Sequence, residues 1–120
     1  MIFVFEVQVK PGASPERYAE AWLRASEIIQ RAAGARGTRL HRRIGDSGSL
    51  LAIASWDSKA QRDAADGQRD RRVQAILDEQ SEFVSIRVVG EFEDPEWVVV
   101  PEAPADPARG GGYGDPARRL

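Results

Sequence analysis

The chain has 120 residues, of which 42% are hydrophobic and 30% charged, the composition of one globular domain. Its 17 basic and 19 acidic residues give a net charge of −2, which argues against a nucleic-acid partner. The lack of cysteine excludes disulfides and thiolate metal sites, and a single histidine excludes a histidine-rich metal site, so no tightly held metal is expected.

The first two elements are predicted to be a strand and an amphipathic helix. Residues 2–9 are rich in β-branched and aromatic side chains, which indicates a strand. Ser14 followed by Pro15 is typical of a helix start, because the serine hydroxyl can cap free amides and proline has no amide to satisfy. Apolar residues then recur at helical spacing, which predicts a helix over residues 15–33 that Gly34 ends.

Two further strands are predicted to form a hairpin. Residues 37–44 and 49–56 have strand character, and the Gly-Asp-Ser-Gly segment at 45–48 is a turn sequence between them. The second of these strands is apolar at both alternating positions. It is therefore expected to be covered on both of its faces.

A second helix and a fourth strand complete the regular elements. A capping-box sequence at residues 58–61 predicts a helix to about residue 79, kinked or in two parts because Asp66-Gly67 interrupts it. Residues 83–93 indicate the fourth strand. Residues 94–120 are rich in proline and glycine and are predicted to be a tail, whose apolar segment is interpreted as an arm that docks on a partner subunit.

The order of elements predicts an α+β fold. Strand, helix, strand, strand, helix, strand is the ferredoxin-like βαββαβ arrangement, here a domain over residues 1–93 with both helices on one face of a four-stranded antiparallel sheet. The first and third strands are apolar on both faces, so the second face of the sheet would leave a large exposed apolar patch. We therefore predict a homodimer that packs sheet against sheet as a dimeric α/β barrel.

Three short motifs resemble the antibiotic biosynthesis monooxygenase (ABM) domain family. They are Val9-Lys10-Pro11-Gly12 before the first helix, Gly37 at the start of a strand, and Trp56-Asp57-Ser58 before the second helix. The resemblance covers residues 1–93 and implies a dimeric barrel with a pocket between the sheet and the helices of each subunit. Some members of the family oxidise polyketide-like phenols with molecular oxygen and no cofactor, and others degrade haem.

The resemblance implies a cofactor-independent monooxygenase that oxidises a small aromatic or polyketide-like phenol with O2 in secondary metabolism. Haem is not expected, because the haem-degrading branch uses an asparagine and a histidine of the second helix, and this chain has no asparagine and no histidine there. No flavin is expected either, since no Gly-rich nucleotide loop is present. The alternative is a non-oxygenase on the same scaffold: a small-molecule binding or stress-response module, or a cyclase or isomerase.

The location and partners follow from what the sequence lacks. No signal peptide or membrane span is visible, which predicts a cytoplasmic protein without a membrane partner. The expected partners are a second copy of the chain, a small aromatic molecule and O2.

Three residues are predicted to take part in catalysis. Trp56 closes the third strand and corresponds to a tryptophan of the family, although a core role is equally consistent with the sequence. His41 is the only side chain whose reference pKa lies near neutrality, although an exposed strand residue without a catalytic role is also consistent with the sequence. Arg39 lies on the same side of its strand, and its charge would favour the neutral, basic form of His41 or stabilise a substrate anion.

Five further residues are predicted to bind substrate. Tyr18 and Trp22 lie one helical turn apart and would stack on an aromatic ligand, or serve as plain core residues. Glu6, Gln8 and Arg87 are polar residues within apolar strands, which indicates either a ligand or a polar contact between subunits.

Overall fold

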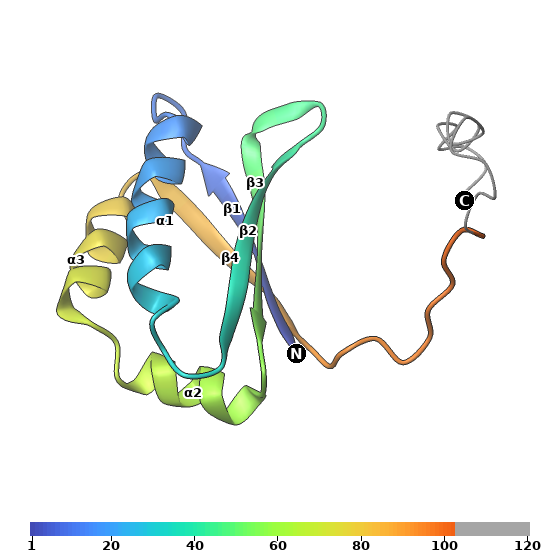
Figure 1. The fold of residues 1–120 in the computed structure, drawn as a ribbon. Helices are drawn as coiled ribbons and strands as arrows, with labels where there is room; N and C mark the ends of the chain where they lie inside the picture. Colours follow the sequence, from blue (N-terminus) through green and yellow to red (C-terminus); the bar gives the residue numbers. More distant parts are fainter. Residues whose placement is uncertain (103–120) are drawn as a thin grey trace, which may run out of the picture.

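The computed structural model describes residues 1–102 and has the predicted ferredoxin-like α+β fold (Figure 1). Its elements are β1 (Ile2–Val9), α1 (Pro15–Ile29), β2 (Ala35–Arg43), β3 (Asp46–Trp56), α2 (Lys59–Gly67), α3 (Arg71–Gln80) and β4 (Val84–Phe92). The four strands pair antiparallel in the order β2-β3-β1-β4. The predicted second helix is two helices, α2 and α3, as the break in its sequence indicated.

Helix α1 begins where the sequence predicts and ends earlier. The Ser14 hydroxyl accepts a hydrogen bond from the Arg17 amide at 3.3 Å, and Pro15 occupies the first turn. After Ile29 the amides of Arg31 and Ala32 bond to carbonyls only three residues back. The helix therefore tightens into turns before residue 33, the predicted end, because the chain must reverse to enter β2.

The hairpin between β2 and β3 is tighter than predicted. The predicted Gly-Asp-Ser-Gly loop is largely part of β3, which starts at Asp46. Only Ile44 and Gly45 separate the two strands, and Gly45 has a φ of +89°, a conformation that favours glycine. A two-residue turn of this kind leaves more residues free to pair across the hairpin.

The N-terminal ends of α2 and α3 are both capped by side chains. The Ser58 hydroxyl accepts from the Gln61 amide at 3.1 Å, which confirms the predicted cap of α2. Asp70 caps α3 by accepting from the Arg72 amide at 2.7 Å. Each cap satisfies an amide that the first helical turn cannot pair. The chain therefore ends one helix at this break and starts a second, separately capped helix.

The two faces of the sheet have different neighbours. Phe5 and Val7 of β1 face the helices, where Val7 packs in a core cluster with Tyr18 of α1 and Leu50 of β3. Figure 1 shows α1 and α3 on this side of the sheet, and no helix of residues 1–102 covers the other side. We call the uncovered side the open face.

The segment after β4 leaves the folded body. The N-terminal amine of Met1 donates to Asp94 at 2.9 Å, which ties the beginning of this segment to the start of β1. Beyond that contact, Figure 1 shows the chain running away from the sheet, and the side chains of Trp97 and Val99 are 88% and 98% exposed. Residues 103–120, which belong to the predicted tail, lie outside the described residues. No helix among residues 1–102 is long and apolar enough to cross a membrane.

Candidate functional site

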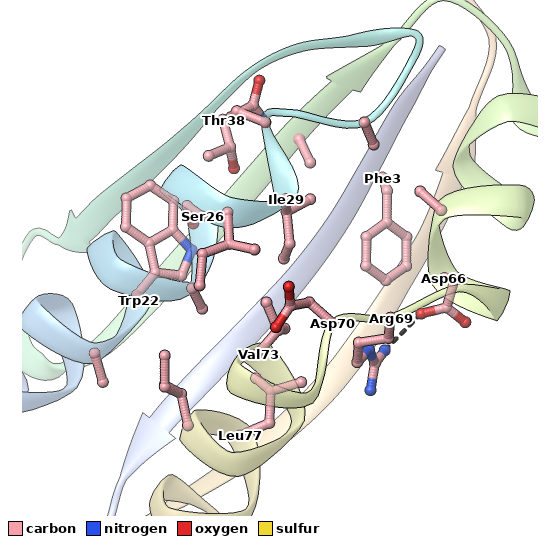
Figure 2. Close-up of a pocket in the computed structure, with 18 of the residues that line it drawn as sticks. Phe3, Trp22, Ser26, Ile29, Thr38, Asp66, Arg69, Asp70, Val73 and Leu77 are labelled. Atoms are coloured by element: carbon pink, nitrogen blue, oxygen red, sulfur yellow. Dashed lines mark hydrogen bonds and ion pairs between the residues drawn. The ribbon is translucent and has the colours of Figure 1, made fainter.

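A large pocket lies between the helix-covered face of the sheet and the three helices. Its volume is about 920 Å³, within the range of small-molecule sites. Figure 2 shows Trp22 and Ile29 of α1, Phe3 of β1, and Val73 and Leu77 of α3 around it. The lining is mostly apolar, so the pocket can exclude water from a planar hydrocarbon ligand.

The apolar lining follows directly from the periodicity of the elements. Every second residue of β1 faces the helices, which brings Phe3 and Phe5 to the pocket. The ring centroids of these two phenylalanines are 5.6 Å apart and tilted by 42°, an ordinary aromatic pair. On α1 the residues at helical spacing face the same space, among them Tyr18, Trp22 and Ile29.

Three of the predicted site residues line this pocket: Tyr18, Trp22 and Trp56. Tyr18 and Trp56 are only 6% and 5% exposed, so both also serve the core. Burial raises the pKa of Tyr18 to about 12, which keeps its hydroxyl protonated and makes it a poor base. Trp22 is half-buried and packs beside the core cluster, which leaves part of its ring available to a ligand.

The rim of the pocket carries charged residues from α2, α3 and their junction. Arg69 donates to Asp66 at 2.5 Å and to Gln74 at 3.0 Å, and Figure 2 shows the first of these contacts at the pocket. Arg72 donates to both carboxylate oxygens of Asp70, at 3.1 and 3.0 Å. Both lining carboxylates are therefore already held by an arginine.

Asp70 is a weak base in this setting. The side-chain and backbone hydrogen bonds from Arg72 lower the pKa of Asp70 from 3.8 to about 2. The only histidine of the chain does not line the pocket. The pocket thus offers a ligand apolar contact, aromatic faces and arginine side chains, with no strong proton acceptor among its lining residues.

The register of the sheet places Arg39 and His41 on the open face. Arg39 pairs with Ile53 and His41 with Leu51, whereas the alternate pair Leu40–Ala52 is on the helix side. Both side chains are exposed and neither lines the pocket. The structure therefore does not bring them together with Trp22 and Trp56, and their part in catalysis stays a prediction.

Glu6, Gln8 and Arg87 also lie on the open face. Arg87 and Glu6 form an ion pair of 2.7 Å across the β1–β4 pairing, and the Gln8 amide donates to the Gly48 carbonyl at 3.2 Å. The three residues line a second, smaller depression of about 260 Å³. Their polar groups are satisfied within the chain, and the choice between a ligand and a subunit contact stays open.

Several pocket residues were not among the predicted site residues. Phe3 and Phe5 could have been found, because they share one parity of the first strand. Arg62 gave no signal in the sequence, since it is one of several charged residues in a polar helix. Its guanidinium lies 4.0 Å from the centre of the Phe3 ring. No group of three potential metal-ligating side chains occurs among residues 1–102.

The chain matches one family model in sequence and is similar in fold to solved structures. The family model for antibiotic biosynthesis monooxygenase matches residues 1–68. The fold is similar to that of SnoaB from Streptomyces nogalater, a cofactor-independent oxygenase, with a TM-score of 0.68, 16% identity, and coverage of 84% of this chain and 96% of that one. No curated protein gave a significant sequence match.

Two further solved structures are similar in fold. A crystal structure of an antibiotic biosynthesis monooxygenase has a TM-score of 0.62 and 16% identity, with coverage of 79% of this chain and all of that one. A conserved protein from Methanosarcina mazei has a TM-score of 0.59 and 17% identity, with coverage of 76% and 92%. Since the family model spans more than half of the 120 residues, this chain belongs to the antibiotic biosynthesis monooxygenase family.

Proposed function

We propose that the protein is a cofactor-independent monooxygenase that oxidises a planar phenolic substrate with O2 in the pocket between α1, α3 and the sheet. The observation that carries the proposal is the pocket itself: about 920 Å³, apolar, and lined by the aromatic rings of Phe3, Trp22 and Trp56. Such a pocket fits fused aromatic rings. The similarity in fold to SnoaB, described as a cofactor-independent oxygenase, supports the same chemistry.

The proposed reaction converts a hydroxyanthrone-like ring methylene to a carbonyl. The ionised substrate passes an electron to O2, and the radical pair recombines to a hydroperoxide. Loss of water then leaves the quinone, so one oxygen atom of O2 enters the product and the other leaves as water with both methylene hydrogens. All electrons come from the substrate, which is why the protein needs only to bind, orient and shield it.

Two lining residues with shifted pKa values, Asp70 and Tyr18, are not suited to take the proton from the substrate. Asp70 has a pKa of about 2 and Tyr18 a pKa of about 12, so neither is matched to accept a proton near neutral pH. We infer that the reaction depends mainly on ionisation of the substrate itself. Its rate should then rise with pH until the bound phenol is fully ionised.

We also propose that the active form is a homodimer joined through the open face. The apolar residues Leu51 and Ile53 lie on that face, and no described helix covers them. The exposed apolar segment at residues 97–100 would add to this interface by docking on the partner subunit. Burying both surfaces would remove apolar area from water that a monomer exposes.

The test of the proposed function is oxygen uptake with a panel of hydroxyanthrones and hydroquinones. Purified protein should accelerate uptake for at least one planar phenol, and Trp22→Ala should reduce that acceleration. Leu23→Ala is the matched control, because Leu23 is 52% exposed on the same helix and does not line the pocket. Uptake that is equal with and without protein for the whole panel would contradict the proposal.

A further inference from the structure

The strongest unassigned feature of the pocket is an excess of arginine in its lining. Four arginines (Arg31, Arg62, Arg69, Arg72) line it, against two aspartates. Arg69 and Arg72 are hydrogen-bonded to those aspartates. Of the two remaining arginines, Arg31 acts electrostatically on Asp70, whereas Arg62 forms no ion pair with a lining carboxylate.

Arg62 is the least exposed of the four, and unlike Arg69 and Arg72 it donates no side-chain hydrogen bond among the described residues. Its side chain is 21% exposed, against 36% for Arg69 and 63% for Arg72. Its guanidinium lies 3.7 Å from Asp63 and 3.6 Å from Glu91, and donates no hydrogen bond among the described residues. A half-buried guanidinium with five N–H donors and no hydrogen bond is uncommon, because its donors are strong and costly to leave unpaired.

The neighbouring carboxylates are engaged elsewhere. The Lys59 ammonium donates to Asp63 at 3.0 and 3.2 Å and to Glu91 at 3.2 and 3.3 Å. Lys59 therefore makes the shorter contacts with both carboxylates, and Arg62 forms only longer ion pairs with them. The ion pairs hold the guanidinium in place over Phe3 without using its donors.

Arg62 and Trp22 lie toward different ends of the pocket. Arg62 is over Phe3, near the start of β1, whereas Trp22 packs against the cluster that contains Val7 and Val9. Figure 2 shows Phe3 and Trp22 on opposite sides of the pocket. The Cα atoms of Phe3 and Val7 are four residue steps apart along the extended strand, which is about 13 Å. The pocket therefore has Trp22 toward one end and Arg62 toward the other, and a ligand of fused aromatic rings can extend between them.

We propose that Arg62 is a specificity residue that binds a carboxylate on a planar aromatic ligand, so that the pocket selects acidic over neutral substrates. The inference rests on the proposed function for the pocket, and adds the substrate class. The planar guanidinium can bind a carboxylate with two parallel hydrogen bonds, and the apolar surroundings strengthen that contact. The rings of the ligand would then reach toward Trp22.

The test is calorimetric binding of a matched, non-oxidisable pair to the full chain: anthraquinone-2-carboxylate and anthraquinone-2-carboxamide. The carboxylate should bind at least about tenfold more tightly than the amide, the range of one charge-assisted hydrogen bond. Arg62→Gln should lower the affinity for the carboxylate to about that for the amide, and an unchanged circular dichroism spectrum checks that the variant is folded. Arg62→Lys should retain part of the preference.

Arg24→Gln is the charge-matched control, because Arg24 is exposed on α1 and does not line the pocket. It should leave the preference as in the parent protein. Equal affinity of the parent for both probes, no binding of either probe, or an unchanged preference in Arg62→Gln would each overturn the inference. Because binding is read without turnover, a carboxylate preference with no oxygen uptake would contradict only the proposed function.

Discussion

Trp22 is the residue whose position links the sequence most directly to the proposed chemistry. It follows Tyr18 by one helical turn, so the same spacing that buries Tyr18 in the core directs Trp22 toward the pocket. The two residues divide their roles by burial. Tyr18 belongs to the core cluster, whereas Trp22 packs beside it and remains half-exposed to a ligand.

The variants Trp22→Ala and His41→Ala test which face of the sheet carries the reaction. Trp22→Ala should weaken binding of a planar substrate about tenfold, through lost stacking and apolar contact. If the reaction takes place in the pocket, His41→Ala should leave turnover unchanged, because His41 lies on the open face. Steady-state kinetics on both variants checks this. A loss of about a hundredfold or more in His41→Ala would instead place a general base on the open face.

Asp70 should contribute stability that depends on pH. Its bonds from Arg72 lower its pKa to about 2, below the value of 3.8 for an unfolded chain. A lowered pKa in the folded state stabilises the fold above about pH 4, and this stabilisation is lost as the pH falls toward 2. Asp70→Ala should therefore lower the melting temperature by a few degrees at pH 7 and less at pH 3.

Glu79→Ala is the control for Asp70, because Glu79 is an exposed carboxylate on the same helix and caps nothing. Thermal unfolding followed by circular dichroism at several pH values gives the comparison. A penalty for Asp70→Ala that is the same at pH 3 and pH 7 would show that the cap does not act through its charge.

At the scale of single elements, the turn between α1 and β2 depends on Gly34. Its φ is +87°, and a Cβ atom there would lie 2.6 Å from the side chain of Gln61. Gly34→Ala should therefore destabilise the protein by about 1–2 kcal/mol from backbone conformation alone. Gly67→Ala, at the end of α2, meets nothing within 4 Å and should be neutral or stabilising. Equal melting temperatures for the two variants would refute this account of the turn.

The elements could be predicted well from the sequence because their signals are local. Strand alternation, the Ser14 cap and the interruption at Gly67 each depend on a few adjacent residues, and the structure confirms these elements. Element ends were less accurate, since the last turn of α1 and the hairpin depend on tertiary contacts such as the bond from the Gly37 amide to Gln30 at 2.8 Å.

The pocket was harder to predict than the elements. Parity within a strand groups residues on one face, but it does not say which face the helices cover. Arg39 and His41 were grouped correctly with each other, yet the register places them opposite the pocket. Arg62 could not be predicted at all, because its position over Phe3 depends on where α2 lies relative to β1.

For the whole molecule, the open face is the surface that the proposed dimer would bury. Leu51→Asp should break the dimer, because Leu51 lies on that face opposite Glu6 and a buried, unpaired charge is costly. Ile44→Asp is the control, since Ile44 is fully exposed in the hairpin turn. Light scattering should give twice the 13.2 kDa of the chain for the parent and for Ile44→Asp, and 13.2 kDa for Leu51→Asp. A molar mass of 13.2 kDa for the parent protein at micromolar concentration would contradict the proposed dimer.

The measurement that tests the central claim most directly is the fate of ¹⁸O₂ during turnover of a hydroxyanthrone by chelator-treated protein. The account predicts that each quinone gains one labelled oxygen atom, that one O2 is consumed for each quinone formed, and that the rate is unaffected by the chelator. Trp22→Ala should slow this labelled product, and Leu23→Ala should not. Quinone that takes its new oxygen from water, or that forms as fast without the protein, would contradict the account.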